Sequence, residues 1–277
     1  MSDLNGARVA LLEGRMSREL ANLVRRYGGE PLSAPALKEE RLDRSKEVAA
    51  FIDSLRNGDL QVVLFLTGVG VSTLFKEADG LGRLPELLKA LNEVTTVCRG
   101  PKPTAVLRRE HIRISVGVRE PYTTTEILEA TATLSLRGKG VGLVHYGERN
   151  IPLAEGLERE GARLEELCLY EWHLPEDIGP LKQLVREVVA GSVDATAFTS
   201  QIQVRHLFQV AAEMGLADEL NHALNTKTVV VAIGPTCAAA LESAGVTPKV
   251  VPQHPKMGTM MTALAAYLKQ RGGDSSD

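Results

Sequence analysis

Residues 60–75 read Leu-Gln-Val-Val-Leu-Phe-Leu-Thr-Gly-Val-Gly-Val-Ser-Thr-Leu-Phe, and this stretch decides the fold. The run 60–66 is almost continuously apolar, which is typical of a parallel strand buried on both faces. After the glycines of the turn, apolar residues recur at helical spacing. The stretch therefore predicts a buried strand that leads directly into a helix, the unit from which α/β proteins are built.

A second copy of this pattern lies in the other half of the chain. Residues of the first half match residues of the second in an almost constant register: Phe65 with Phe198, Val71 with Val204, Leu74 with Leu207, Ala90-Leu91-Asn92 with Ala223-Leu224-Asn225, and Gly100-Pro101 with Gly234-Pro235. Matched glycines and a repeated triplet indicate an internal duplication, since chance apolar matches would not keep one register.

Each half alternates strand-like and helix-like segments. The predicted strands are 8–12, 60–66, 94–98 and 112–118 in the first half, and 141–145, 195–199, 229–233 and 249–251 in the second. Alternation of this kind predicts parallel sheets covered by helices on both faces. The length of 277 residues favours two domains, and the proline-containing segments 34–36 and 172–177, in equivalent places of the two halves, are predicted linkers.

The composition excludes several classes of function. A net charge of −3 and an aromatic content of 4% argue against a general nucleic-acid or anionic-membrane partner. No apolar run is long enough for a membrane helix, and the first residues lack the pattern of a secretory signal. Three cysteines far apart in sequence favour a reducing compartment and no metal site. We therefore expect a cytoplasmic protein without a metal or cofactor.

Four predicted strands lead into turns that begin helices. Residues 67–72 lie in the context of a dinucleotide-binding turn, but Thr73 replaces the third glycine, so nucleotide binding is a weak alternative. Residues 100–102, 200–203 and 234–236 form the other turns. Because helix N-termini bind anionic groups and ligands of such folds lie at the carboxyl ends of strands, the turns predict a shared anion site.

Strong catalytic motifs are missing from the sequence. It contains no nucleophile elbow, no paired-histidine zinc motif and no phosphate-binding loop of the P-loop type, and its six histidines are scattered. If the protein is an enzyme, we expect it to work mainly by holding a reactive substrate in shape.

Several segments resemble uroporphyrinogen-III synthases. The resemblance rests on Phe198-Thr199-Ser200, on the block 231–241 with its Ile-Gly-Pro-Thr core, on Leu167-Cys168-Leu169-Tyr170, and on 64–71 in the first half. Two departures stand out: Cys237 replaces the family's second threonine after Gly-Pro, and the Thr-Arg-Pro that follows the first strand in the family is absent. Arg15 is the nearest candidate for that arginine.

The resemblance implies an α/β fold of two flavodoxin-like (HemD-like) domains with parallel sheets, joined by a two-stranded ladder. Residues 1–36 and 175–277 would form one domain, residues 37–174 would form the other, and the two linkers would be the crossing strands. The implied activity is that of a lyase (a hydro-lyase) that closes hydroxymethylbilane to uroporphyrinogen III with loss of water and inversion of ring D. It implies no cofactor, and we expect a monomer.

The resemblance also suggests site residues. Tyr170 is the candidate to assist departure of the substrate hydroxyl as a hydrogen-bond donor. The residues predicted to bind the substrate carboxylates, through backbone N–H groups or charged side chains, are Arg15, Thr67, Gly68, Val69, Arg99, Gly100, Pro101, Lys102, Tyr146, Ser200, Gln201, Ile202, Gly234, Pro235 and Thr236. The alternative is a non-enzymatic two-domain protein that closes on a small ligand.

Overall fold

The computed structural model describes residues 3–273, and the chain divides into two compact units. One unit, unit 1, contains the chain up to Lys38 and again from His173 onward. The other, unit 2, is the continuous segment Glu39–Trp172. The chain thus leaves unit 1, builds unit 2 and returns.

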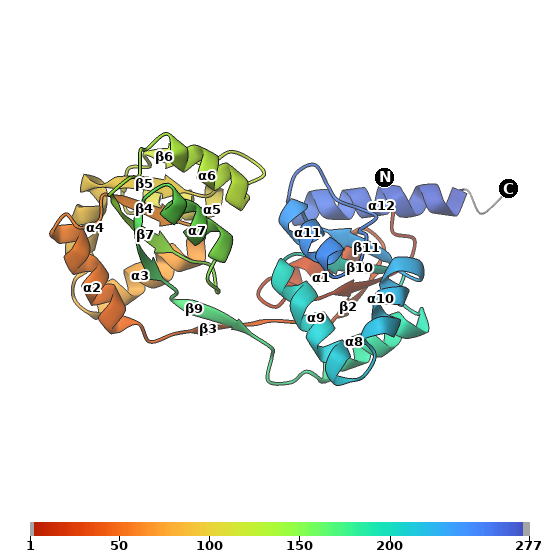
Figure 1. Ribbon diagram of the computed structural model, residues 1–277. Coiled ribbons are helices and arrows are strands. Elements are labelled where there is room, and N and C mark those ends of the chain that lie inside the picture. Colours follow the sequence, from red (N-terminus) through yellow and green to blue (C-terminus); the bar gives the residue numbers. More distant parts are fainter. Residues whose placement is uncertain (1–2, 274–277) are drawn as a thin grey trace. The chain divides into compact units, whose positions relative to one another are not determined.

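Unit 2 is built on a five-stranded sheet in the order β6-β5-β4-β7-β8, with every neighbouring pair parallel (Figure 1). Its strands are β4 (Val62–Phe65), β5 (Thr95–Cys98), β6 (Val116–Gly117), β7 (Gly140–Val144) and β8 (Arg163–Leu167). Its helices are α2 (Ser45–Arg56), α3 (Gly68–Gly80), α4 (Leu84–Glu93), α5 (Pro101–Arg109), α6 (Thr124–Ala132) and α7 (Ile151–Arg159).

The central strand β4 explains the apolar run of the sequence. Val63 and Phe65 pack into the core beneath α2, α3, α4 and α5, whereas Val62 and Leu64 face the core beneath α6 and α7. All four side chains are buried because helices cover both faces of the sheet.

Unit 1 repeats this construction around a four-stranded parallel sheet in the order β11-β10-β1-β2 (Figure 1). Its strands are β1 (Arg8–Leu11), β2 (Glu30–Ser33), β10 (Ala195–Phe198) and β11 (Val229–Ala232). The helices α8 (Gly179–Ala190), α9 (Gln201–Glu213), α10 (Ala217–Thr226) and α11 (Pro235–Ser243) share one core, and α1 (Ser17–Arg26) and α12 (Met257–Gly273) share the other.

The duplication is visible in the order of the elements. In unit 2, β4 is followed by α3, α4, β5 and α5; in unit 1, β10 is followed by α9, α10, β11 and α11. These are the segments that match in sequence. The fold therefore confirms the predicted α/β class with parallel sheets and repeated architecture.

One crossing strand overlaps the predicted linker 172–177, at Trp172 and His173, and the other begins just after the predicted linker 34–36. The crossing strands are β3 (Lys38–Arg41) and β9 (Tyr170–His173), which pair in a two-stranded sheet (Figure 1). The segment 34–36 instead stays attached to unit 1, because the amides of Ala34 and Ala36 donate to the carbonyls of Leu11 and Leu12. Pro35 has no N–H to donate to a paired strand, which also favours the exclusion of 34–36 from the two-stranded sheet.

Two predicted edge strands are shorter than expected. Of 112–118 only β6 pairs with β5, at Val97–Val116 and Cys98–Gly117. Of 249–251 only Val250 forms a bridge, to Val231. Prolines at 248 and 252 flank this second segment, and a residue without an N–H cannot extend a ladder.

Candidate functional site

The start of α3 lies at the carboxyl end of β4. Thr67 is the N-cap, in extended conformation, and its hydroxyl accepts the Gly70 N–H at 2.9 Å. The amides of Gly68 and Val69 belong to the first turn, where no carbonyl of the helix can reach them. This turn therefore directs two backbone donors and the positive end of the helix dipole toward the edge of the sheet.

The start of α5 lies beside it. A Cβ placed on Gly68 would be 3.0 Å from the Lys102 carbonyl oxygen, a tighter contact than side chains usually make, so glycine favours this close approach of the two helix starts. Gly100 is the N-cap of α5 and Pro101 the first helical residue. Because Pro101 and Pro103 lack an N–H, Lys102 carries the one amide donor among the first three residues of α5. Pro101 thus shapes this turn and donates nothing.

Arg99 is a partly buried arginine that directly follows β5. Its Nε donates to the Tyr122 carbonyl at 2.8 Å, and its guanidinium carbon lies 5.3 Å from the centre of the Tyr146 ring. Burial lowers the pKa of Arg99, an effect that Tyr146 and Tyr170 partly oppose. Within residues 3–273, no carboxylate pairs with it. Arg99 is partly buried, so the desolvation of its charge is not compensated by an anion among these residues, and this arrangement is typical of a site that receives an anion from outside.

Tyr170, the predicted hydrogen-bond donor, is the first residue of β9. It is 1% exposed, and its hydroxyl lies 3.0 Å from Thr67 Oγ1, where either oxygen can be the donor. Its ring packs edge-on against Trp172, with centroids 5.4 Å apart. The hydroxyl therefore lies at the start of α3, and its proximity to Arg99 is reflected in the pKa of that guanidinium.

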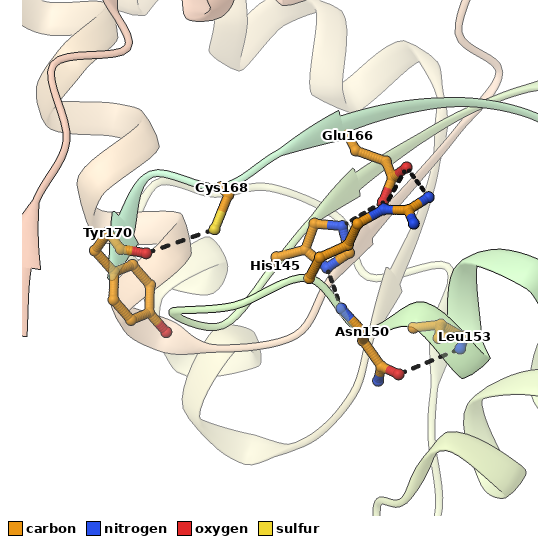
Figure 2. A network of polar contacts seen from close by, with 7 residues as sticks. His145, Asn150, Leu153, Glu166, Cys168 and Tyr170 are labelled. Carbon is orange, nitrogen blue, oxygen red and sulfur yellow. Dashed lines mark hydrogen bonds and ion pairs between the residues drawn. The ribbon is translucent and has the colours of Figure 1, made fainter. Parts of the chain in front are cut away.

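The loop between β7 and α7 completes this cluster, and of its residues the sequence predicts only Tyr146. His145 Nε2 lies 2.7 Å from Glu166 on β8, and Arg149 binds the same carboxylate at 2.7 Å (Figure 2). Asn150 caps α7 by accepting the Leu153 N–H. The one available hint was the position of His145 at the end of a buried strand. Tyr146, which was predicted, belongs to this loop.

The corresponding turns of unit 1 are less suited to anions. Gln203 accepts the Thr199 N–H at 2.7 Å, and the Thr199 hydroxyl donates to Glu13, which follows β1. Sequence reasoning missed Glu13 and Gln203. A carboxylate already occupies the neighbourhood of the α9 start, where a helix dipole favours it.

Two features of unit 1 remain available for a ligand. Ser200 occupies the N-cap position of α9, before Gln201 and Ile202, but its side chain does not cap the helix. Its hydroxyl is buried and, within the described part of the chain, has no hydrogen-bond partner. At the end of β11, Gly234 and Pro235 begin α11 as Gly100 and Pro101 begin α5, and Thr236 supplies a first-turn amide.

Arg15 lines an open concavity of about 530 Å³ beside α1. The concavity is lined by Gly14, Arg15, Ser17, Arg18, Glu19, Ala21, Arg25 and Ser33. The residues that the structure brings together are those of unit 2, namely Thr67, Gly68, Arg99, Gly100, Lys102, Tyr146 and Tyr170.

Cys98 and Cys237 are buried, free cysteines. Burial raises the pKa of Cys98 to about 11 and that of Cys237 to about 12, so both thiols are protonated at neutral pH. Among residues 3–273, no group of three or more His, Cys, Asp or Glu side chains is arranged to hold a metal ion. In the same part of the chain, no helix has the length and apolar character needed to cross a membrane.

Comparison with known proteins agrees with the geometry. The family model described as uroporphyrinogen-III synthase HemD matches residues 18–262. An uncharacterized protein of Bacillus subtilis, YjjA, is 30% identical over 268 residues, which cover 97% of this chain and 98% of the relative. A putative uroporphyrinogen-III synthase of Methanothermobacter thermautotrophicus is 32% identical and covers 91% of this chain and 94% of that protein.

A crystal structure of a mutant uroporphyrinogen III synthase from the extremely thermophilic bacterium Thermus thermophilus has the same fold. It is 27% identical, with a TM-score of 0.77, and the match covers 96% of this chain and 100% of that one. The family match spans most of the chain, and the structural match spans both units. This chain belongs to the uroporphyrinogen-III synthase family.

Proposed function

We propose that this protein is a uroporphyrinogen-III synthase, a lyase that removes water from hydroxymethylbilane and closes the ring with inversion of ring D. Family membership supports this proposal, and the observation in the structure that carries it is the cluster in unit 2. There an arginine without a carboxylate partner among residues 3–273 lies close to a hydroxyl pair and two helix starts.

The chemistry of the substrate fits that cluster. Hydroxymethylbilane carries eight carboxylates and loses a hydroxyl group to give an azafulvene cation. The α-carbon of ring D that carries the bridge to ring C attacks the azafulvene methylene and gives a spiro intermediate. The bond from that carbon to the bridge then breaks, which leaves an azafulvene on ring C. The free α-carbon of ring D attacks this azafulvene and loses its proton, so ring D is inverted. The substrate is reactive by itself, so the enzyme must mainly position it, a contribution that reaches about 7–11 kcal/mol in well-oriented reactions.

We assign the carboxylate-binding role first to unit 2. Arg99 offers a fork of N–H donors, and Gly68, Val69 and Lys102 offer first-turn amides beside it. In unit 1, Ser200, Gln201, Ile202, Gly234, Thr236 and Arg15 are proposed as further contacts, with Ser200 supported by its buried hydroxyl, which has no partner in the described part of the chain.

The proposed function is tested by product identity. Freshly prepared hydroxymethylbilane is incubated with the protein, the products are oxidised, and the type I and type III isomers are separated. We expect type III to dominate and to increase with protein concentration, against a control without protein that gives type I.

Tyr170 is expected to assist departure of the hydroxyl by hydrogen bonding. A phenol is a weak acid, so Tyr170→Phe should lower kcat about 3–10-fold without abolishing activity. The measurement is kcat for type III formation, with folding checked by circular dichroism. Tyr27→Phe is a matched control, because Tyr27 also bonds a threonine hydroxyl, that of Thr262 at 2.8 Å, within unit 1.

Activity of Tyr170→Phe below one per cent of wild type, with the fold intact, would contradict a merely assisting role. Such a result would make the Tyr170 hydroxyl essential to the reaction.

A further inference from the structure

The loop from His145 to Asn150 is closed at both ends by one carboxylate. His145 at the start of the loop places Nε2 at 2.7 Å from Glu166 Oε2, and Arg149 near its end binds Glu166 through Nε and Nη2 (Figure 2). Glu166 lies on β8, the edge strand that pairs with β7, so the loop is held against the sheet.

The contacts of His145 select its neutral form. The Asn150 backbone N–H points at Nδ1 at 3.2 Å, which makes Nδ1 an acceptor. The ring proton is therefore on Nε2, where it is donated to Glu166. A second proton on Nδ1 would face the Asn150 N–H, and two donors repel. His145 is 1% exposed, so no solvent relieves that conflict.

This loop supports the site through two residues. Tyr146 lies under the Arg99 guanidinium at 5.3 Å. Gly147 has φ +60°, and a Cβ there would lie 2.0 Å from Trp172 Nε1, so the loop backbone packs directly on the indole. Trp172 in turn packs against Tyr170. A change in the loop therefore reaches Arg99 and Tyr170 together.

We propose that neutral His145 is a positioning residue. By bonding Glu166 and the Asn150 amide, it closes the loop, holds Tyr146 under Arg99 and thereby fixes the guanidinium in the orientation that receives a substrate carboxylate. The substrate part of this inference rests on the proposed function; the loop closure does not.

The inference predicts a response to pH. The charged groups that face His145 are Glu166 from β8 and Arg149 from its own loop; α3 presents backbone at Gly70, and α6 contributes the Thr124 hydroxyl through Asn150. Burial lowers the pKa of His145, Arg149 acts in the same direction, and Glu166 opposes them. In the unfolded chain, a histidine binds its proton near pH 6.5. The stabilisation of the folded protein by neutral His145 is therefore complete above pH 6.5, and it decreases as the pH falls toward the lower pKa of His145 in the folded state.

The single tryptophan of the chain, Trp172, makes the loop observable. The measurement is its fluorescence from pH 8 to pH 4.5 in the whole 277-residue chain, with His173→Asn as the background because His173 is the next residue after Trp172. We expect the Trp172 fluorescence to change in one transition with a midpoint below pH 6.5. His145→Asn keeps an acceptor for the Asn150 amide but cannot titrate, so it should abolish the transition and retain the neutral-pH spectrum.

His145→Phe removes both bonds at similar size. At pH 7.5 it should already show the Trp172 fluorescence spectrum that the His173→Asn protein shows only at acid pH. An unchanged transition in His145→Asn, or a native spectrum in folded His145→Phe, would overturn the proposal. If His145→Phe does not fold, His145→Asn alone decides.

Kinetics test whether the closed loop positions Arg99 to bind the substrate. With hydroxymethylbilane at pH 7.5, His145→Phe should raise KM about tenfold with kcat changed less than about threefold, and His145→Asn should restore most of the KM, since Arg99 supplies binding. His222→Asn, on α10, is the control and should change neither KM nor kcat.

An unchanged KM despite the spectral change would refute positioning of Arg99. Absence of any type III product would refute the proposed function, and the fluorescence would still decide the loop closure.

Discussion

Replacement of Arg99 by glutamine is expected to lower kcat/KM for hydroxymethylbilane about 100-fold without lowering the thermal stability of the free protein. Hydrogen bonds to a charged partner contribute about 1.5–3 kcal/mol, and 1.4 kcal/mol corresponds to a tenfold change. Stability should be unchanged or higher, because Arg99 is a partly buried cation without a carboxylate partner among residues 3–273. The measurements are steady-state kinetics and a thermal melt without substrate.

A neighbouring arginine provides the control for Arg99. Arg108 is exposed in the last turn of α5, the helix that begins directly after Arg99 and Gly100, and Arg108→Gln should leave kcat/KM within about twofold of wild type. A loss of less than threefold in Arg99→Gln would show that Arg99 does not bind the substrate. A large drop in melting temperature would show that its role is structural.

A negative charge at the start of α3 is expected to have the second-largest effect. Val69→Asp should lower kcat/KM at least about 30-fold relative to Val69→Asn, because the carboxylate occupies the helix start that is proposed to receive substrate carboxylates. The same charge favours the helix, since acidic residues in the first turn stabilise it by about 0.3–1 kcal/mol. Activity and stability should therefore change in opposite directions.

The Asp and Asn variants have nearly the same shape, so their ratio isolates charge. We expect the ratio to shrink as ionic strength rises from about 0.02 to 0.5 M, because salt screens the repulsion. Equal kcat/KM values in the two variants at low salt would contradict anion binding at this turn.

The buried strands could be predicted because their residues carry the information locally. Val62 to Phe65 alternate between two cores, and helices on both faces make every position apolar. The helix starts at Thr67, Gly100 and Gly234 could likewise be predicted, because capping and proline at the first turn are local chemistry.

The pairing of β3 with β9 could not be predicted from local sequence alone. The segments near Pro35 and Pro175 indicated a crossing, but pairing of β3 with β9 depends on which amides are free to donate. Those of Ala34 and Ala36 are already used in unit 1, which moves the crossing strand to Lys38–Arg41.

The side-chain clusters could not be predicted, since they depend on strand order. Arg99 follows β5 and Tyr146 follows β7, and they meet because both strands flank β4 in the sheet. The pair His145–Glu166 requires β7 beside β8, and Glu13–Thr199 requires β1 beside β10. Tyr170 was identified through the family resemblance, and the structure adds its Thr67 partner.

Isomer analysis of the product made at limiting hydroxymethylbilane tests the central claim most directly. Wild-type protein should give mainly uroporphyrinogen III, at a rate proportional to protein concentration, and Arg99→Gln at the same concentration should shift the product toward the type I isomer. Product that is type I at the rate of the protein-free control, from folded wild-type protein, would contradict the claim that this chain closes hydroxymethylbilane with inversion of ring D.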